Sequence, residues 1–463
     1  MNLELGSSNI RKVKKFIFDH WYETVRTVPK DEGSLIGLPH PYTVPCCKGS
    51  FQELYYWDTY FTSVGLLADG QKDLAIGNTL NIMNLVERFG FMPNGNRTFY
   101  LNRSQPPYLG PLIAMVSAKT EDPDFAINAA PILEREYQFW TAKRLSPTGL
   151  FHHGNHAPRQ ELIEFYPVVA PRVGLTDRSP EECLKELSHT MAEAETGWDF
   201  TPRFNDVCEN FCAIDLNSNL YLYELLLAAW SGSAASSRWL DKARQRRALM
   251  CQLCWDEEQG GFFDYNFVEK KRGSFVTAAA LHPLWCGLAD KRQAALTVEK
   301  ILPQLEYPYG ISAGAIPKKP RRICQWDYPN AWPPLQHITY RALQRYGYME
   351  DARRIARKYI ETVCRGFEKT GDLWEKYNAV DGTTRTVNEP GYLPSTVPPP
   401  KDEVLHGQTN EPGHLSSTSD DDHTIRLMGW TAGVFLDALA FLEDESSFWL
   451  LDPRYQLECT KVP

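Results

Sequence analysis

Two carboxylic acids in this sequence each follow a tryptophan at a point where helical periodicity stops. Asp199 follows Trp198 in ETGWDFTPRF (195–204), and Glu375 follows Trp374 in LWEKYN (373–378). An aromatic wall removes water from a carboxyl group and raises its pKa, so one acid of a pair can stay protonated while the other stays ionised. Such a pair suits hydrolysis of a glycosidic bond by direct attack of water, with the two groups about 6.5–9.5 Å apart. The alternative is chance, because 58 Asp and Glu residues will include some beside an aromatic ring.

Three further segments combine aromatic rings with polar groups. They are GSFQELYYWDTYF (49–61), PNGNRTFYLNRSQPP (93–107) and QWDYPNAWPP (325–334). A sugar site needs ring faces for C–H surfaces and polar groups for hydroxyls, and Phe, Trp and Tyr make up 12% of the chain. Proline fixes φ and removes a backbone donor, so we expect QWDYPNAWPP to be an irregular loop. Its Asp327 could bind sugar hydroxyls or hold the loop, and the sequence leaves both open.

Helical periodicity predicts the elements that position these five segments. Apolar residues recur at spacings of three and four in 8–26, 72–89, 123–143, 182–195, 214–231, 236–254, 274–289, 292–304, 333–346, 349–366 and 427–443. Convincing strands are few. We therefore expect an all-α protein, a single domain over 1–463, in which helix hairpins form a toroid with the long loops at one mouth. Residues 383–425, rich in Pro, Ser, Thr and Asp, are predicted to form a long lid loop.

Composition excludes several classes of partner. A formal net charge of −9 gives no basic footprint for nucleic acid or an anionic membrane surface. No apolar stretch approaches the ~18 residues of a membrane span, and no signal peptide is visible. The 11 cysteines lack regular spacing, and one CxxC (Cys251 and Cys254) without a second pair does not predict zinc. We expect reduced thiols in a cytoplasmic protein with no metal site.

The segments resemble those of a known family, the trehalases, which are inverting hydrolases of α,α-trehalose. QWDYPNAWPP resembles the tryptophan-rich signature of that family, and GSFQELYYWDTYF resembles its other signature. PNGNRTFYLNRSQPP, ETGWDFTPRF and LWEKYN are similar to three more family segments, and all five occur in the family order over roughly residues 40–440. The resemblance implies an (α/α)6 toroid, a disaccharide or α-glucoside substrate, and no metal or organic cofactor. It also implies that Asp199 is the general acid and Glu375 the general base.

Further site residues follow from the same resemblance, position by position. Those that fall where family members hold the sugars are Trp57, Asp58, Asn94, Arg103, Ser104, Gln105 and the backbone at Gly197. Arg159 and Glu161, in HAPRQE, correspond to a substrate-contacting Arg-x-Glu, although Arg172 competes for the arginine position. Trp326 and Trp332 are expected to line the mouth with their rings toward a sugar face. Asp58 and Arg103 could alternatively form a buried ion pair that ties loops together.

Two departures from the family pattern leave the substrate open. Ser50 stands where the first signature has an arginine, and nearby Lys48 is a poor copy of a bidentate guanidinium. The glycine-rich run that ends in Glu-Tyr is replaced by residues 383–425, where Glu389 or Glu411 could supply the missing carboxylate. Trehalose is the first substrate expected. The alternatives are glucosylglycerate, mannosylglycerate or another glucosyl disaccharide with the same mechanism, and a non-catalytic sugar-binding protein.

Overall fold

Helices form most of the computed structural model, which describes residues 8–388 and 426–444. The α-helices are α1 Ser8–His20, α2 Tyr56–Ala68, α3 Lys72–Phe89, α4 Leu109–Thr120, α5 Pro123–Lys143, α6 Arg159–Val173, α7 Leu184–Glu195, α8 Ile214–Trp230, α9 Ser233–Leu253, α10 His282–Trp285, α11 Lys291–Leu296, α12 Leu302–Leu305, α13 Pro333–Arg345, α14 Met349–Thr370 and α15 Gly429–Glu443. Among the described residues, no helix is both long and apolar enough to cross a lipid bilayer.

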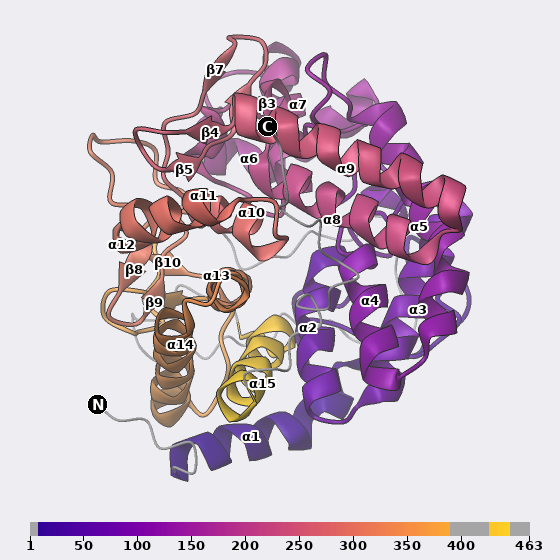
Figure 1. The fold of residues 1–463 in the computed structure, drawn as a ribbon, viewed down its shortest axis with the longest axis vertical. Coiled ribbons are helices and arrows are strands. Elements are labelled where there is room, and N and C mark those ends of the chain that lie inside the picture. The colour runs from indigo at the N-terminus through magenta and orange to yellow at the C-terminus, as the bar shows by residue number, and fades with distance from the viewer. Residues whose placement is uncertain (1–7, 389–425, 445–463) are drawn as a thin grey trace.

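Six of these helices form a closed inner ring, visible around the centre of Figure 1. Helix α2 contacts α4, and the ring continues through α8, α10, α13 and α15, which contacts α2 again. Outer helices pack behind this ring: α3 on α2 and α4, α5 on α4 and α8, α9 on α8, and α14 on α13 and α15. The fold is an (α/α)6 toroid, as the sequence and the family resemblance predicted.

Burial explains which helices lie inside. Of the 17 residues of α8, 16 are buried, so this helix is covered on every side. Helix α14 buries residues at spacings of three and four, such as Ile355, Tyr359 and Val363, and turns its charged face outward. Inner positions such as that of α8 therefore go to helices that are buried on every side, and outer positions such as that of α14 to amphipathic ones.

The ring closes through a glycine contact between its first and last helices. Gly65 of α2 and Gly433 of α15 lie so close that a Cβ atom on either would overlap the backbone of the other helix. Small residues allow this close approach of two helix backbones. The chain thus joins residues about 370 positions apart at one tight crossing.

Short antiparallel strands connect the loops. They are β1 Val25–Arg26 with β2 Tyr42–Thr43, β3 Phe211–Cys212 with β6 Tyr265–Asn266 and β7 Lys271–Arg272, β4 Trp255–Asp256 with β5 Gly261–Phe262, β8 Glu306–Tyr307 with β9 Gly310–Ile311, and β10 Asn330–Ala331 with β11 Tyr377–Asn378. In the last pair Asn330 lies opposite Asn378 and Ala331 opposite Tyr377. This pairing attaches QWDYPNAWPP directly to LWEKYN.

Three helices were missed by periodicity: α2, α4 and α6. Helices α2 and α4 are almost wholly buried, so they have no polar stripe to reveal them, and α6 contains Pro167 and Pro171. GSFQELYYWDTYF is therefore not all loop, because α2 begins at Tyr56. The predicted helix at 274–289 is a turn followed by the short α10, and 292–304 contains a π-helical turn at Thr297–Ile301. Most of the predicted lid, with Glu389 and Glu411, lies outside the described residues.

Candidate active site

The five candidate segments all lie at the start of an inner helix. Along the chain they are the first turn of α2, the stretch 93–107 before α4, the stretch 196–204 before α8, the stretch 325–332 before α13, and the stretch 373–378, which contacts the start of α15. Helices α2, α4, α8 and α13 are each followed by an outer helix that packs back against them, so these inner helices share one direction. Their N-terminal ends therefore lie at one mouth of the toroid, whose ring of helices is drawn in Figure 1.

The acid segment leaves α7 through a fixed turn. Thr196 Oγ1 donates to Glu193 O (2.6 Å), and Trp198 N–H donates to Thr196 Oγ1 (2.9 Å). Gly197 has φ +72°, and a Cβ there would lie 2.8 Å from the indole of Trp57. Only glycine combines this left-handed φ with so close an indole. The glycine at this position thus has a local structural cause, and the predicted role of its backbone in holding a sugar stays a prediction.

The base segment is held between α15 and the tryptophan-rich loop. Trp430 Nε1 donates to the carbonyl of Glu375 (2.9 Å), and Thr431 Oγ1 donates to the carbonyl of Trp374 (2.7 Å). The carboxylate of Glu375 is buried and accepts a hydrogen bond from Lys376 Nζ at 2.7 Å. The backbone and the carboxylate of Glu375 are thus both held by neighbouring side chains.

One side chain connects the acid and base segments. Gln325, the first residue of QWDYPNAWPP, donates through Nε2 to the carbonyl of Asp199. Its Oε1 accepts from Lys376 Nζ at 3.2 Å. Asp199 and Glu375, 176 positions apart in the chain, are therefore joined through two intervening side chains.

Asp58 is a third carboxyl group at the mouth. Its pKa is raised to about 8, first by burial and also by the nearby charges of Glu375 and Asp199, while its own backbone N–H acts in the opposite direction. The position in the first turn of α2 would by itself favour an anion. Desolvation outweighs that effect. Because the charges of Asp199 and Glu375 both act on Asp58, the three carboxyl groups lie near one another.

The tryptophans form a buried stack. Trp326 and Trp332 are 2% and 1% exposed, and their rings are parallel at 3.8 Å. Trp198 stacks on Trp326 at 5.2 Å, and the ammonium of Lys376 lies 4.6 Å from the centre of the Trp332 ring. The expectation that Trp326 and Trp332 turn their faces to a sugar is not met, because those faces already contact other side chains. The two rings instead support the acid and base segments.

The segment before α4 supplies four predicted sugar contacts. Ser104 Oγ donates to Met92 O (2.6 Å) and the Gln105 side chain accepts from Trp57 N–H (3.4 Å), so both are engaged within the protein. Asn94 is buried, and its backbone N–H donates to Arg103 O (3.1 Å). Arg103 lies over the ring of Tyr100, and its Nε has no hydrogen-bond partner among the described residues. Burial lowers the pKa of this guanidinium. Which of the four contacts a sugar stays a prediction.

The Arg-x-Glu pair divides between two environments. Arg159, at the start of α6, is exposed, whereas the carboxylate of Glu161 accepts from Asn102 Nδ2 at 2.7 Å. Arg172, at the other end of α6, donates to Asp199 O (3.5 Å) and lies 4.6 Å from the ring centre of Phe200. Of the two competing arginines, Arg172 is the one beside the acid.

Other residues near the mouth were not among the predicted site residues. Lys376 and Gln325 lie inside two of the five segments but were not predicted as site residues. Each is next to a predicted site residue, Glu375 or Trp326, and neighbours in an extended segment normally face opposite sides. Glu193 is buried on α7 and accepts from Thr201 N–H (2.6 Å), and burial raises its pKa to about 8. Asp327 pairs with Arg321 (2.9 Å from Nε to Oδ2), which supports the loop-holding alternative.

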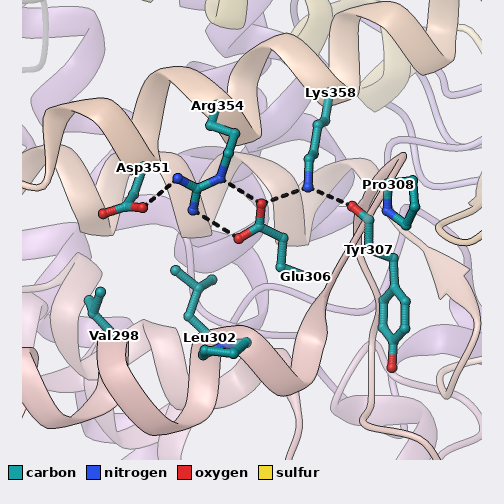
Figure 2. Close-up of a pocket in the computed structure, with 9 residues that line it drawn as sticks. Val298, Leu302, Glu306, Tyr307, Pro308, Asp351, Arg354 and Lys358 are labelled. Carbon is teal, nitrogen blue, oxygen red and sulfur yellow. Dashed lines mark hydrogen bonds and ion pairs between the residues drawn. The ribbon is translucent and has the colours of Figure 1, made fainter.

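A surface cavity lies away from this mouth. It measures about 550 Å³ and is lined by α12, β8 and α14, on the outer side of the toroid. Figure 2 shows that its charged side chains neutralise one another: Glu306 binds both Arg354 and Lys358. Within 8–388 and 426–444, no group of three or more His, Cys, Asp or Glu side chains is arranged to hold a metal ion.

Comparison with known proteins gives consistent matches. A family model described as Trehalase matches residues 6–393. The cytosolic neutral trehalase of Saccharomyces cerevisiae is 35% identical over 404 residues, which cover 76% of this chain and 53% of the relative. That of Beauveria bassiana is 34% identical over 401 residues, covering 74% and 53%. The periplasmic trehalase of Xanthomonas axonopodis pv. citri is 34% identical over 388 residues, covering 77% and 66%. The chain thus spans about half the length of the two fungal relatives.

Solved structures agree with the fold. The neutral trehalase of Saccharomyces cerevisiae matches with a TM-score of 0.68 and 28% identity, covering 88% of this chain and 74% of that one. A mannosylglycerate hydrolase from Thermus thermophilus in complex with glucose has a TM-score of 0.59 at 15% identity, covering 92% and 99%, and shares the toroid. With the sequence match extending over most of its length, the chain belongs to the trehalase family.

Proposed function

We propose that this chain is an inverting glycoside hydrolase that cleaves α,α-trehalose or a closely related α-glucoside. Asp199 protonates the glycosidic oxygen as the bond to the anomeric carbon breaks, and Glu375 removes a proton from the water that attacks that carbon from the opposite face. The products are a β-sugar from the attacked half and the released leaving group.

One observation carries the proposal: Asp199 and Glu375 come from distant segments yet meet at one mouth, linked by Gln325 and Lys376. A general base must be held in place to accept a proton from the attacking water, and the ammonium of Lys376 lies 2.7 Å from Glu375 Oε2. The electrostatic coupling of Asp58 to both groups supports the same arrangement. The relatives named trehalase support the choice of substrate class.

Proton NMR of α,α-trehalose with the purified protein tests the proposal. Inversion releases one β-glucose and one α-glucose per turnover, so the β-anomeric signal must grow from the first minutes, ahead of mutarotation. Initial release of α-glucose alone would contradict the inverting mechanism. The control is the Glu375→Gln variant under the same conditions, which should leave trehalose intact.

The alternative substrates are glucosylglycerate, mannosylglycerate and other glucosyl disaccharides. They stay open because Ser50 replaces the family arginine and Lys48 is exposed, so no lysine charge is buried in its place. A panel of these substrates, followed by the same NMR signals, separates them from trehalose. A non-catalytic sugar binder would bind members of the panel, measured by calorimetry, and cleave none.

A cytoplasmic location belongs to this proposal. The ten cysteines among the described residues form no disulfide with one another, and the two fungal relatives are named cytosolic. A periplasmic relative matches at a similar identity, so cell fractionation with an antibody to the protein is the direct test.

A further inference from the structure

The ammonium group of Lys376 is wholly enclosed by the protein, since the residue has 0% exposure. It contacts Glu375 Oε2 (2.7 Å), Gln325 Oε1 (3.2 Å) and the face of Trp332 (4.6 Å to the ring centre). A buried ammonium is costly unless it is paired and hydrogen-bonded. The surroundings offset that cost with one carboxylate, one amide oxygen and one ring face.

The side-chain amide of Gln325 has only one possible orientation in this cluster. A carbonyl oxygen can only accept and an ammonium can only donate, so the amide must turn its NH2 toward Asp199 O and its oxygen toward Lys376. Gln325 is itself buried, and its own carbonyl accepts from Trp332 Nε1 at 3.1 Å and from Asn330 Nδ2 at 2.7 Å. The side chain is thus fixed at both ends and at its backbone.

We propose that Lys376 and Gln325 form a positioning strap that places a positive charge against the carboxylate of Glu375 and sets the position of that carboxylate relative to the segment bearing Asp199. The strap is the chain of contacts Glu375–Lys376–Gln325–Asp199 O. This proposal rests on the proposed function and deepens it. Neither residue needs to touch the substrate, since each acts through a neighbour.

The two members of the strap have different effects. Lys376 supplies the positive charge, so its removal alters the ionisation of the base and its position together. Gln325 carries no charge, so its removal loosens the link between the two segments without changing the charge at the base. The two effects can therefore be separated by a pH profile.

The test measures kcat, KM and the pH dependence of kcat/KM on the best α-glucoside of the panel. Lys376→Met should lower kcat by about 100-fold or more, in the range that general base catalysis contributes, with little change in KM. The acidic limb of its profile should move up by about one pH unit or more, because a carboxylate that loses an adjacent cation binds protons more tightly. Lys376→Arg should restore the position of that limb and part of kcat.

Gln325→Leu should lower kcat by about 10-fold while the acidic limb stays in place, since the lost alignment carries only part of the positioning effect. This variant and Lys376→Arg keep the test decisive if Lys376→Met does not fold. A wild-type kcat in both Gln325→Leu and Lys376→Arg would contradict the positioning strap. So would a Lys376→Met enzyme with an unchanged acidic limb.

Lys358 is the matched control. It also binds a glutamate, with 2.6 Å between Nζ and Glu306 Oε1, but it lies on α14 in the outer cavity of Figure 2. Lys358→Met removes a Lys–Glu pair of the same kind away from the mouth. Its kcat and pH profile should match the wild type.

A measurement without turnover separates failure of the strap from failure of the proposed function. In ¹⁵N-lysine-labelled protein, the buried ammonium of Lys376 should give a slowly exchanging signal that Lys376→Arg removes and Glu375→Gln shifts. If the wild type cleaves no α-glucoside, the proposed function fails and this signal still decides the contacts of the strap. A signal that Glu375→Gln leaves unchanged would overturn it.

Discussion

Asp58 should make the fold less stable as the pH rises. Its pKa in the folded protein is about 8, against an ordinary value of 3.8. Between these two values the unfolded chain has lost this proton while the folded chain retains it. Since the unfolded state then binds fewer protons, the free energy of unfolding falls with rising pH from about 4 to about 8.

The size of the effect follows from the same two values. They differ by roughly four pH units, and at 1.36 kcal/mol per unit the upper limit is about 6 kcal/mol at pH 8. The side chain retains some contact with solvent, which reduces the penalty, so we expect about 2–4 kcal/mol. Asp58→Asn keeps the shape and removes the charge. The variant should therefore be more stable than the wild type at pH 8 by about this amount, and much less so near pH 4.

Urea unfolding of both proteins at pH 4.5 to 9 provides the assay, with the difference in free energy plotted against pH. The difference should rise up to about pH 8 and then level off, and the more stable variant should lose activity because Asp58 is a candidate sugar contact. Asp73→Asn, an exposed aspartate in the first turn of α3, is the control and should show no such rise. A flat difference for Asp58→Asn would refute the reasoning.

The remaining predictions concern the catalytic pair and two glycines. Asp199→Asn and Glu375→Gln should each lower kcat by about 1,000-fold, while sugar binding measured by calorimetry is retained. Azide should rescue Glu375→Gln with formation of a β-glycosyl azide. A near-normal rate in either variant would contradict the catalytic role of that residue. Gly197→Ala should cost about 1–3 kcal/mol in urea unfolding and lower kcat, because φ is +72° and the new methyl group meets an indole. Gly433→Ala should cost about 3 kcal/mol by overlapping the backbone of α2, whereas Gly232→Ala, with open space around it, should cost little.

Sequence reasoning recovered the outer part of the fold better than the inner ring. An amphipathic helix such as α14 is detectable because one face meets water and the other does not. Helix α2 gives no such signal, since only a few of its positions reach solvent, and its first turn was taken as part of a loop. Of the inner helices next to the candidate site, α2 and α4 were missed for this reason, whereas α8, α13 and α15 were predicted.

The sequence predicted which residues belong to the candidate site better than it predicted which side chains contact one another there. Asp58 lies close enough to Asp199 and Glu375 to feel the charge of both, and the catalytic and sugar-binding roles of the three stay predictions. The tryptophan-rich loop was expected to face the substrate, but its rings stack on one another and on an ammonium group. Spacing along the chain cannot reveal this arrangement, because it depends on Lys376 and Gln325 arriving from separate segments. Which side chains touch the sugar stays a prediction.

The closure of the ring at Gly65 and Gly433 also sets an order of events during synthesis. Of the described helices, α15 leaves the ribosome last, yet it contacts α2 from the beginning of the chain and holds the carbonyl of Glu375 through Trp430. A nascent chain that has reached only residue 388 carries both candidate catalytic carboxyl groups but lacks the helix that seals the toroid. Contacts between such distant parts of a chain form slowly, because a long loop must close first. The ring of described helices is therefore complete only after α15 docks on α2, and a product that ends before α15 would leave the ring open.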